Sequence, residues 1–195
     1  MNRFLDRNGW DLGKYEPSDL RSLEAYRFHV RTYRSPVPLD VAWKAYAALD
    51  PSSAWTTSRT RPGVVWDPAS SRLYAPGESA PAFSAGQVYV IDLRILGVLR
   101  IPAAFRITRI DEPERLIEFV YLRRNLSNGL QRIRFLELPG TDGTTGTFIR
   151  HVTWYRSGRS FRDAALYGPV HAALIDAFHA EVFRRIGQPL AASPE

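Results

Sequence analysis

The residues with the clearest chemical potential lie in an alternating stretch from Thr145 to Arg156. One side of this stretch carries Ile149, His151, Thr153 and Tyr155, and the other carries Phe148, Arg150, Val152 and Trp154. If the first side faces the interior, His151 and Tyr155 can orient a carbonyl or phenol, or move a proton near neutral pH. If the second side faces inward, His151 is exposed, and the alternation leaves both orientations open. Tyr121, on another stretch of alternating residues, is a third candidate for the same chemistry.

Metal and cofactor chemistry has no comparable signature. The four histidines are His29, His151, His171 and His179, and no two of them have the spacing of a helical zinc motif. His29 and His151 would approach each other if the first and last strands pair, but surface and capping histidines are more common, so we expect no metal. The chain has no cysteine, nucleophile elbow, phosphate loop or dinucleotide fingerprint, and we expect no cofactor.

Composition predicts one globular domain. The chain has 195 residues, of which 45% are hydrophobic, and no apolar run approaches the roughly 20 residues that span a bilayer. The N-terminus has no apolar core of the secretory type, so we take the cytoplasm as the compartment. The net charge of +6 comes almost entirely from arginines that alternate with apolar residues along the chain. That distribution is typical of the solvent face of a sheet and argues against a nucleic-acid partner.

The pattern of the chain predicts an α+β protein whose elements follow one another in a simple order. Alternation and turn signals predict a strand at 25–34, a helix at 39–49, and short strands at 63–66 and 72–74 within an irregular passage at 57–85. Five longer strands are predicted at 87–95, 97–110, 115–124, 130–138 and 145–156, forming an antiparallel meander. Apolar residues at helical spacing then predict a long helix from Pro169 to Ile186, which Gly187 ends.

This order favours a helix-grip architecture, in which a curved antiparallel sheet wraps around the long C-terminal helix. An apolar concave face must be covered, and that helix is the only element large enough to cover it. A sheet that wraps one helix tends to leave a pocket, although a fully packed core remains the alternative. Strand parity and helix spacing give the predicted ligand-facing residues: Tyr89, Ile91, Phe105, Ile107, Phe119, Tyr121, Phe135, His151, Leu174 and Phe178.

One segment also resembles a known family. Pro38, Asp40, Trp43, Leu49, Asp50, Pro51 and Trp55 follow one another as in the opening helix motif of the START-like (SRPBCC) superfamily. This superfamily includes polyketide cyclases, lipid-transfer domains and the birch-pollen allergen group. Residues 110–116 resemble its strand-turn-strand passage, and Gly129 lies where a later strand opens. The resemblance is greatest to a bacterial branch, covers about residues 25–187, and implies the helix-grip fold. The proline-rich passage at 57–85 departs from simple members.

These observations predict an N-terminal arm at 1–24, a START-like domain at 25–187 and a C-terminal tail at 188–195. We expect the domain to bind or carry a hydrophobic small molecule, such as a lipid, an isoprenoid or a polyketide-like ring, without transforming it. Two alternatives stay open. One is a cyclase or dehydratase that uses His151 with Tyr155 or Tyr121, and the other is a basic interaction module without a pocket.

Overall fold

The computed structural model describes residues 23–50, 55–95, 99–122, 125–140, 143–156 and 167–193. These residues form two helices and nine strands. The helices are α2 (Leu39–Ala47) and α4 (Tyr167–Arg185). The strands are β1 (Arg27–Ser35), β2 (Thr60–Asp67), β3 (Arg72–Tyr74), β4 (Val88–Ile95), β5 (Leu99–Asp111), β6 (Leu116–Tyr121), β7 (Asn128–Pro139), β8 (Thr145–Arg156) and β9 (Ala191–Ser193).

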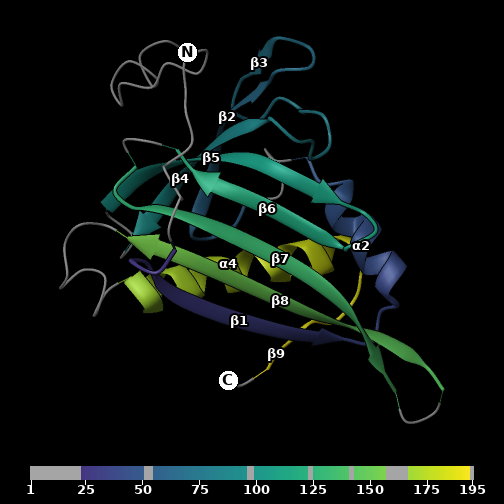
Figure 1. Cartoon of the computed structure of the whole chain (residues 1–195). Coiled ribbons are helices and arrows are strands. Elements are labelled where there is room, and N and C mark those ends of the chain that lie inside the picture. Colours follow the sequence, from purple (N-terminus) through teal and green to yellow (C-terminus); the bar gives the residue numbers. More distant parts are fainter. Residues whose placement is uncertain are drawn as a thin grey trace.

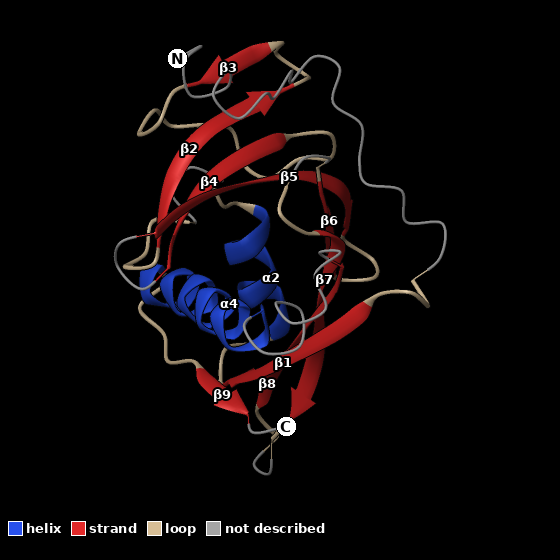
Figure 2. Ribbon diagram, turned by 90° about the vertical axis from the view of Figure 1, so that its left-hand side faces the viewer, coloured by secondary structure: helices blue, strands red, loops and turns tan. Residues whose placement is uncertain are grey.

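All nine described strands join one antiparallel sheet in the order β3-β2-β4-β5-β6-β7-β8-β1-β9. Strands β4 to β8 form the predicted meander, and β1 pairs with β8 although they lie far apart in the sequence. The sheet bends around α4, with α2 beside that helix in the same hollow (Figures 1 and 2). The predicted helix-grip fold is therefore confirmed.

The ends of α4 follow from its terminal residues. Pro169 lies in the first turn, where its missing N–H costs no helical hydrogen bond. Gly187, just past the last turn, has a φ of 66°, a left-handed conformation that favours glycine. There the N–H of Gly187 donates to the Arg184 carbonyl at 3.1 Å, and the N–H of Gln188 donates to the Phe183 carbonyl at 3.0 Å. These bonds satisfy carbonyls that the last helical turn leaves open.

The main core lies between the concave face of the sheet and the two helices. Its side chains come from β1 to β8, from α2 and α4, and from connecting segments that include Trp55 and Phe83. A second, smaller cluster lies on the opposite face at the β2-β4-β5 end and comprises Val64, Val88, Val90, Ala104 and Leu122. The sequence did not predict this second cluster, because alternation suggests that one face of each strand is solvated.

Two stretches are more regular than predicted. Strand β2 has eight residues where four were predicted at 63–66, and it includes Pro62, which was not expected in a ladder. The pairing of β2 with β4 is interrupted between Pro62 and Val65, so Pro62 lies beside a break in the hydrogen-bonding pattern. Residues 191–193, placed in the expected C-terminal tail, form β9 and pair with β1. Of the expected arm, residues 1–22 lie outside the described residues.

Within the described ranges, no helix is both long and apolar enough to cross a bilayer.

Candidate functional site

Strand β8 presents its histidine side to the interior. His151, Thr153 and Tyr155 are buried against the core, whereas Arg150 is exposed on the other face. The orientation that the alternation left open is therefore the one that brings His151 and Tyr155 inside. The reason is the position of β8 between β7 and β1, beneath α4, where the inward side of all three strands is enclosed.

His151 belongs to a continuous chain of buried hydrogen bonds. Its Nδ1 lies 2.9 Å from Nε2 of His179 on α4, and its Nε2 lies 2.9 Å from Oε1 of Gln131 on β7. Nδ1 of His179 lies 2.5 Å from the hydroxyl of Tyr46 on α2. At the other end, Nε2 of Gln131 donates to the Tyr121 hydroxyl on β6 at 2.7 Å. These five residues, which we call the buried polar chain, link both helices to three strands.

The imidazoles of His151 and His179, the two histidines of the buried polar chain, are neutral. Burial lowers the pKa of His151 well below its ordinary value, and the neighbouring His179 and His29 lower it further. Burial, with a contribution from the Arg31 charge, lowers the pKa of His179 to about 3. Burial also raises the pKa of Tyr46 well above its ordinary value, so its hydroxyl keeps its proton.

Neutrality fixes the direction of the chain. Gln131 Oε1 can only accept, so His151 carries its hydrogen on Nε2 and accepts at Nδ1. His179 then donates from Nε2 and accepts at Nδ1 from the Tyr46 hydroxyl. Each residue of the buried polar chain therefore donates to the next one in the direction from Tyr46 to Tyr121. This direction follows from the orientation of the Gln131 amide, whose oxygen faces His151. Both ring nitrogens of His151 are engaged, so its imidazole can act on another molecule only by breaking one of these bonds.

Side chains around α4 hold His179 in place. The Tyr33 ring lies against the His179 ring, with centroids 4.3 Å apart. The Tyr33 hydroxyl donates to Oδ1 of Asp176 at 2.7 Å, and Arg31 donates to both oxygens of the same carboxylate at 2.8 and 3.0 Å. Since Asp176 and His179 lie one turn apart on α4, β1 anchors the helix where it presents His179.

A second group of side chains fills the hollow beyond the polar chain, and its members are mostly aromatic. Trp55 lies at its centre, stacked on Phe178 of α4 with centroids 4.4 Å apart. Tyr89 and Phe105 lie side by side on β4 and β5, 5.4 Å apart. Among the described residues, three polar atoms of the concave side are buried without a well-formed hydrogen bond: Trp55 Nε1, the Tyr89 hydroxyl oxygen and Thr153 Oγ1. Burial raises the pKa of the Tyr89 hydroxyl, and a weak hydrogen bond from the Trp55 indole opposes that rise.

Most predicted ligand-facing residues lie in this core. Tyr89, Ile91, Phe105, Ile107, Phe119, Tyr121, Phe135 and Phe178 belong to one buried apolar cluster, and His151 lies against Phe119. Leu174 is buried but lies outside that cluster, to which its neighbour Ile175 belongs. Tyr155 is buried on the same face of β8, across from Gly129.

Sequence reasoning missed Tyr46, Trp55, Gln131 and His179. His179 follows Phe178 on α4, and helical spacing alone did not separate it from the solvent side. His29 was considered as a neighbour of His151, but in the β1–β8 register His29 lies opposite Thr153, and Arg31 lies opposite His151. Within the described ranges, no three His, Cys, Asp or Glu side chains converge as metal ligands would.

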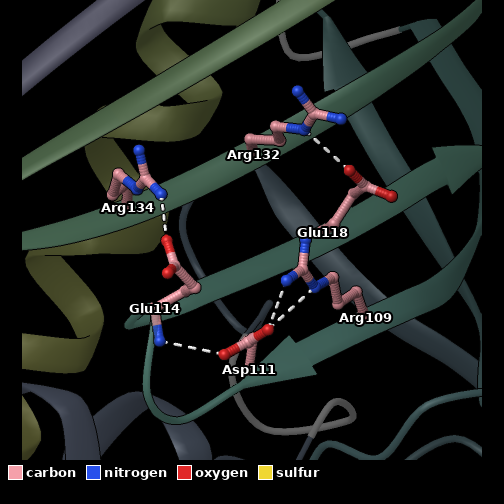
Figure 3. Close-up of polar contacts among 6 residues, drawn as sticks. All are labelled: Arg109, Asp111, Glu114, Glu118, Arg132 and Arg134. Atoms are coloured by element: carbon pink, nitrogen blue, oxygen red, sulfur yellow. Dashed lines mark hydrogen bonds and ion pairs between the residues drawn. The ribbon is translucent and has the colours of Figure 1, made fainter.

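The outer face of β5, β6 and β7 carries the alternating charges seen in the sequence, and these charges pair with one another. Arg132 lies 2.7 Å from Glu118, and Arg134 lies 2.5 Å from Glu114 (Figure 3). Arg109 bonds Asp111, whose other oxygen accepts from the Glu114 N–H at 2.9 Å. Much of the arginine charge on this face is therefore matched by a carboxylate.

The fold is similar to several solved structures. Major latex-like protein 151 from Panax ginseng superposes with a TM-score of 0.55 at 10% identity, covering 80% of this chain and 95% of that one. Ms6760 from Mycobacterium smegmatis gives 0.54 at 14% identity, covering 89% and 96%. Truncated norcoclaurine synthase from Thalictrum flavum gives 0.54 at 14% identity, covering 81% and 94%.

This chain has the START-like fold. The predicted resemblance is confirmed at that level. No protein-family model and no curated protein matches the chain. The TM-scores of 0.54 and 0.55 show a shared fold, and at identities of 10% and 14% each neighbour's activity remains its own. Within this fold, the buried polar chain and the aromatic group occupy the space between sheet and helix.

Proposed function

We propose that this chain binds an apolar small molecule between α4 and the concave face of the sheet. The observation that carries the proposal is the set of three buried polar atoms on Trp55, Tyr89 and Thr153 for which the described residues supply no well-formed hydrogen bond. A buried donor or acceptor left unpaired costs about 1–3 kcal/mol, so each such atom needs an explanation. A ligand with a few polar groups would supply the missing hydrogen bonds, and the surrounding rings would bury its apolar part.

The structural neighbours support this proposal. Norcoclaurine synthase from Thalictrum flavum, whose structure was solved with dopamine and hydroxybenzaldehyde, shares the fold with a TM-score of 0.51 at 14% identity. That enzyme binds small aromatic molecules on this architecture. For this chain, residues 25–187 are the proposed ligand-binding domain, with the cytoplasm as the proposed compartment.

Native mass spectrometry of the purified chain, combined with titration of the apolar dye 1-anilinonaphthalene-8-sulfonate, tests the proposal. We expect a bound mass that disappears on denaturation, or saturable dye binding that weakens about tenfold or more in Phe178→Ala. Leu136→Ala, on the outer face and 44% exposed, is the control and should bind dye like the wild type. The proposal fails if the folded chain carries no ligand and binds no dye, or if both variants bind dye equally.

A second candidate function is acid–base catalysis of the cyclase or dehydratase kind, which the buried polar chain favours. With His151 engaged on both nitrogens, the Tyr121 hydroxyl at the end of the chain is the group that would meet a substrate. Incubation with a poly-β-ketone model substrate tests this candidate. Catalysis requires that His151→Ala abolish product formation, whereas a carrier would show no product and nearly unchanged dye affinity in that variant.

The pairing of outer-face charges supports the expectation that nucleic acid is not the partner. A binding surface would present unneutralised arginines, and binding would fall steeply with salt. Electrophoretic mobility of mixed-sequence DNA and RNA at 50 and 200 mM salt checks this point, and tight, strongly salt-dependent binding would favour the interaction-module alternative.

A further inference from the structure

Four arginines gather at the end of the sheet where β4 is followed by β5. Arg94 of β4 lies directly opposite Arg100 of β5, and Arg61 of β2 lies opposite Asp92 of β4. The backbone N–H of Arg94 donates to the carbonyl of Arg59 at 2.7 Å, so Arg59 lies beside the same pair. These four arginines come from three neighbouring segments of the sheet, and we call them the arginine patch.

The strand residues of the arginine patch lie on the outer face of the sheet. Arg94 has the same strand parity as Val90, which belongs to the small outer cluster. Arg100 likewise has the parity of Ala104 in that cluster, and Arg61 lies opposite a residue of the same parity. The patch is open to solvent, because Arg94 is half-buried and the other three arginines are exposed.

The arginine patch has more positive charge than its neighbours neutralise. In the described ranges, Asp92 is the one carboxylate within 4.0 Å of a patch arginine, and its Oδ2 lies 3.9 Å from Nε of Arg100. Four arginines and one aspartate leave three positive charges without a carboxylate partner. Like charges directly opposite each other, such as Arg94 and Arg100, also destabilise a strand pair. By contrast, each arginine in Figure 3 bonds a carboxylate.

The sequence between β4 and β5 indicates which kind of anion the patch would meet. The five residues that separate Arg94 from Arg100 have no charged or polar side chain. They are Ile95, Leu96, Gly97, Val98 and Leu99. Arginines beside an uncharged apolar stretch are typical of proteins that bind the surface of an anionic membrane. Nucleic-acid surfaces instead combine arginines with polar or aromatic side chains that contact the bases.

We propose that the arginine patch docks this end of the sheet on an anionic lipid surface. Guanidinium groups donate to lipid phosphate and carboxylate oxygens, and the lipid charge offsets the repulsion between Arg94 and Arg100. The patch lies on the face opposite the hollow that holds α4, so this inference does not depend on the proposed ligand binding. Each arginine near such a surface contributes about a fivefold gain in affinity.

Flotation of the chain with large unilamellar vesicles tests this proposal. One vesicle set contains phosphatidylcholine alone, and the other also contains about 30 mol% phosphatidylserine, an anionic lipid. The patch variant carries Arg94→Gln and Arg100→Gln, and Arg61→Gln is a second, independent variant. The control variant carries Arg34→Gln and Arg150→Gln, which remove two exposed arginines from β1 and β8, several strands away. Thermal unfolding checks that each variant folds.

We expect the wild type to bind the anionic vesicles and not the neutral ones, with weaker binding at 200 than at 50 mM NaCl. Binding should weaken about 25-fold in the patch variant, about fivefold in Arg61→Gln and less than about twofold in the control. The patch variant should unfold at the wild-type temperature or above it, since it removes facing like charges.

Three results would overturn the proposal. The first is a wild type that does not bind anionic vesicles, and the second is an equal loss in the control and the patch variant. The third is DNA or RNA binding that the patch variant loses while vesicle binding is unchanged, which would assign the patch to nucleic acid. Because no measurement involves the hollow, a chain that binds no ligand there would leave these outcomes unaffected.

Discussion

His151 of the last long strand and His179 of the C-terminal helix lie ring to ring, with Nδ1 and Nε2 2.9 Å apart. The contact joins β8 to α4 through two neutral imidazoles, and Tyr46 and Gln131 complete the hydrogen bonding on either side. A buried polar network of this kind stabilises one arrangement of helix and sheet, because any shift leaves a buried nitrogen unpaired.

The stability of the fold should fall as the pH drops below about 6.5. Burial lowers the pKa values of His151, His171 and His179 in the folded state. In the unfolded chain these histidines bind protons near pH 6.5, so the unfolded state gains protons first. The loss begins near pH 6.5 and continues toward the folded-state pKa, which is about 3 for His179. Between pH 7 and 5 it amounts to about 2 kcal/mol for each histidine that stays neutral.

Urea unfolding at pH 7, 6 and 5 measures this dependence. His179→Gln keeps a donor and an acceptor but cannot titrate. Unfolding of this variant should therefore take up about one proton fewer than unfolding of the wild type, and its free energy of unfolding should change less with pH. A wild-type free energy of unfolding that is constant from pH 7 to 5 would contradict the neutral-imidazole assignment.

Replacing Tyr46 by Phe should destabilise the protein by about 1–3 kcal/mol at pH 7. The change removes the donor to His179 Nδ1 and leaves that buried nitrogen without its hydrogen bond. Tyr74→Phe, on the short strand β3, is the matched control and should cost less than about 1 kcal/mol. Chemical denaturation compares the two variants, and equal costs would indicate that the Tyr46–His179 bond contributes little.

Gly129→Ala should destabilise the fold by about 1–3 kcal/mol. A Cβ at this position would lie 2.1 Å from the Trp154 carbonyl oxygen and 3.1 Å from Cδ2 of Tyr121. The close approach of β8 and the Tyr121 ring therefore requires glycine. At Gly168, in the first turn of α4, an added Cβ meets nothing within 4 Å, so Gly168→Ala should be neutral or slightly stabilising. Thermal unfolding of both variants checks the contrast, which would be absent if β8 can shift away from Gly129.

Glu118→Gln should change the free energy of unfolding by less than about 1 kcal/mol. Glu118 bonds Arg132 and Thr108 on the outer face, where Arg132 is partly exposed and solvent screens the pair. Urea unfolding at 50 and 500 mM NaCl measures the effect. A larger loss that disappears at high salt would show that the paired charges act as a network.

Much of the fold was predictable from the sequence, because strand parity and turn residues are local signals. The boundaries of β8 match the prediction, and Phe105, Phe119 and Phe135 face the core as their alternation indicated. Strand β1 shows the limit of this reasoning. Its apolar Phe28 is 69% exposed, and its inward side carries Arg31 and Tyr33, whose polar atoms bond Asp176 of α4. Hydropathy does not reveal that a helix supplies the matching carboxylate.

The candidate site was predictable only in part, for a similar reason. His151 and Tyr121 were identified from their strands, but the partners that define their chemistry come from α2, α4 and β7. Trp55 was noticed only as part of a family motif, and its central place among the aromatic rings depends on the packing of distant segments. Such convergence depends on tertiary contacts that no local pattern encodes.

The pairing of β1 with β8 also constrains how the polypeptide acquires its shape during synthesis. Arg27 lies opposite Tyr155, so the first strand has no neighbour until more than a hundred further residues have emerged from the ribosome. Contacts so distant in sequence close slowly, and folding times of milliseconds to seconds are typical of such topologies. Until then both edges of β1 are unpaired, and we expect nascent chains truncated before β8 to recruit chaperones.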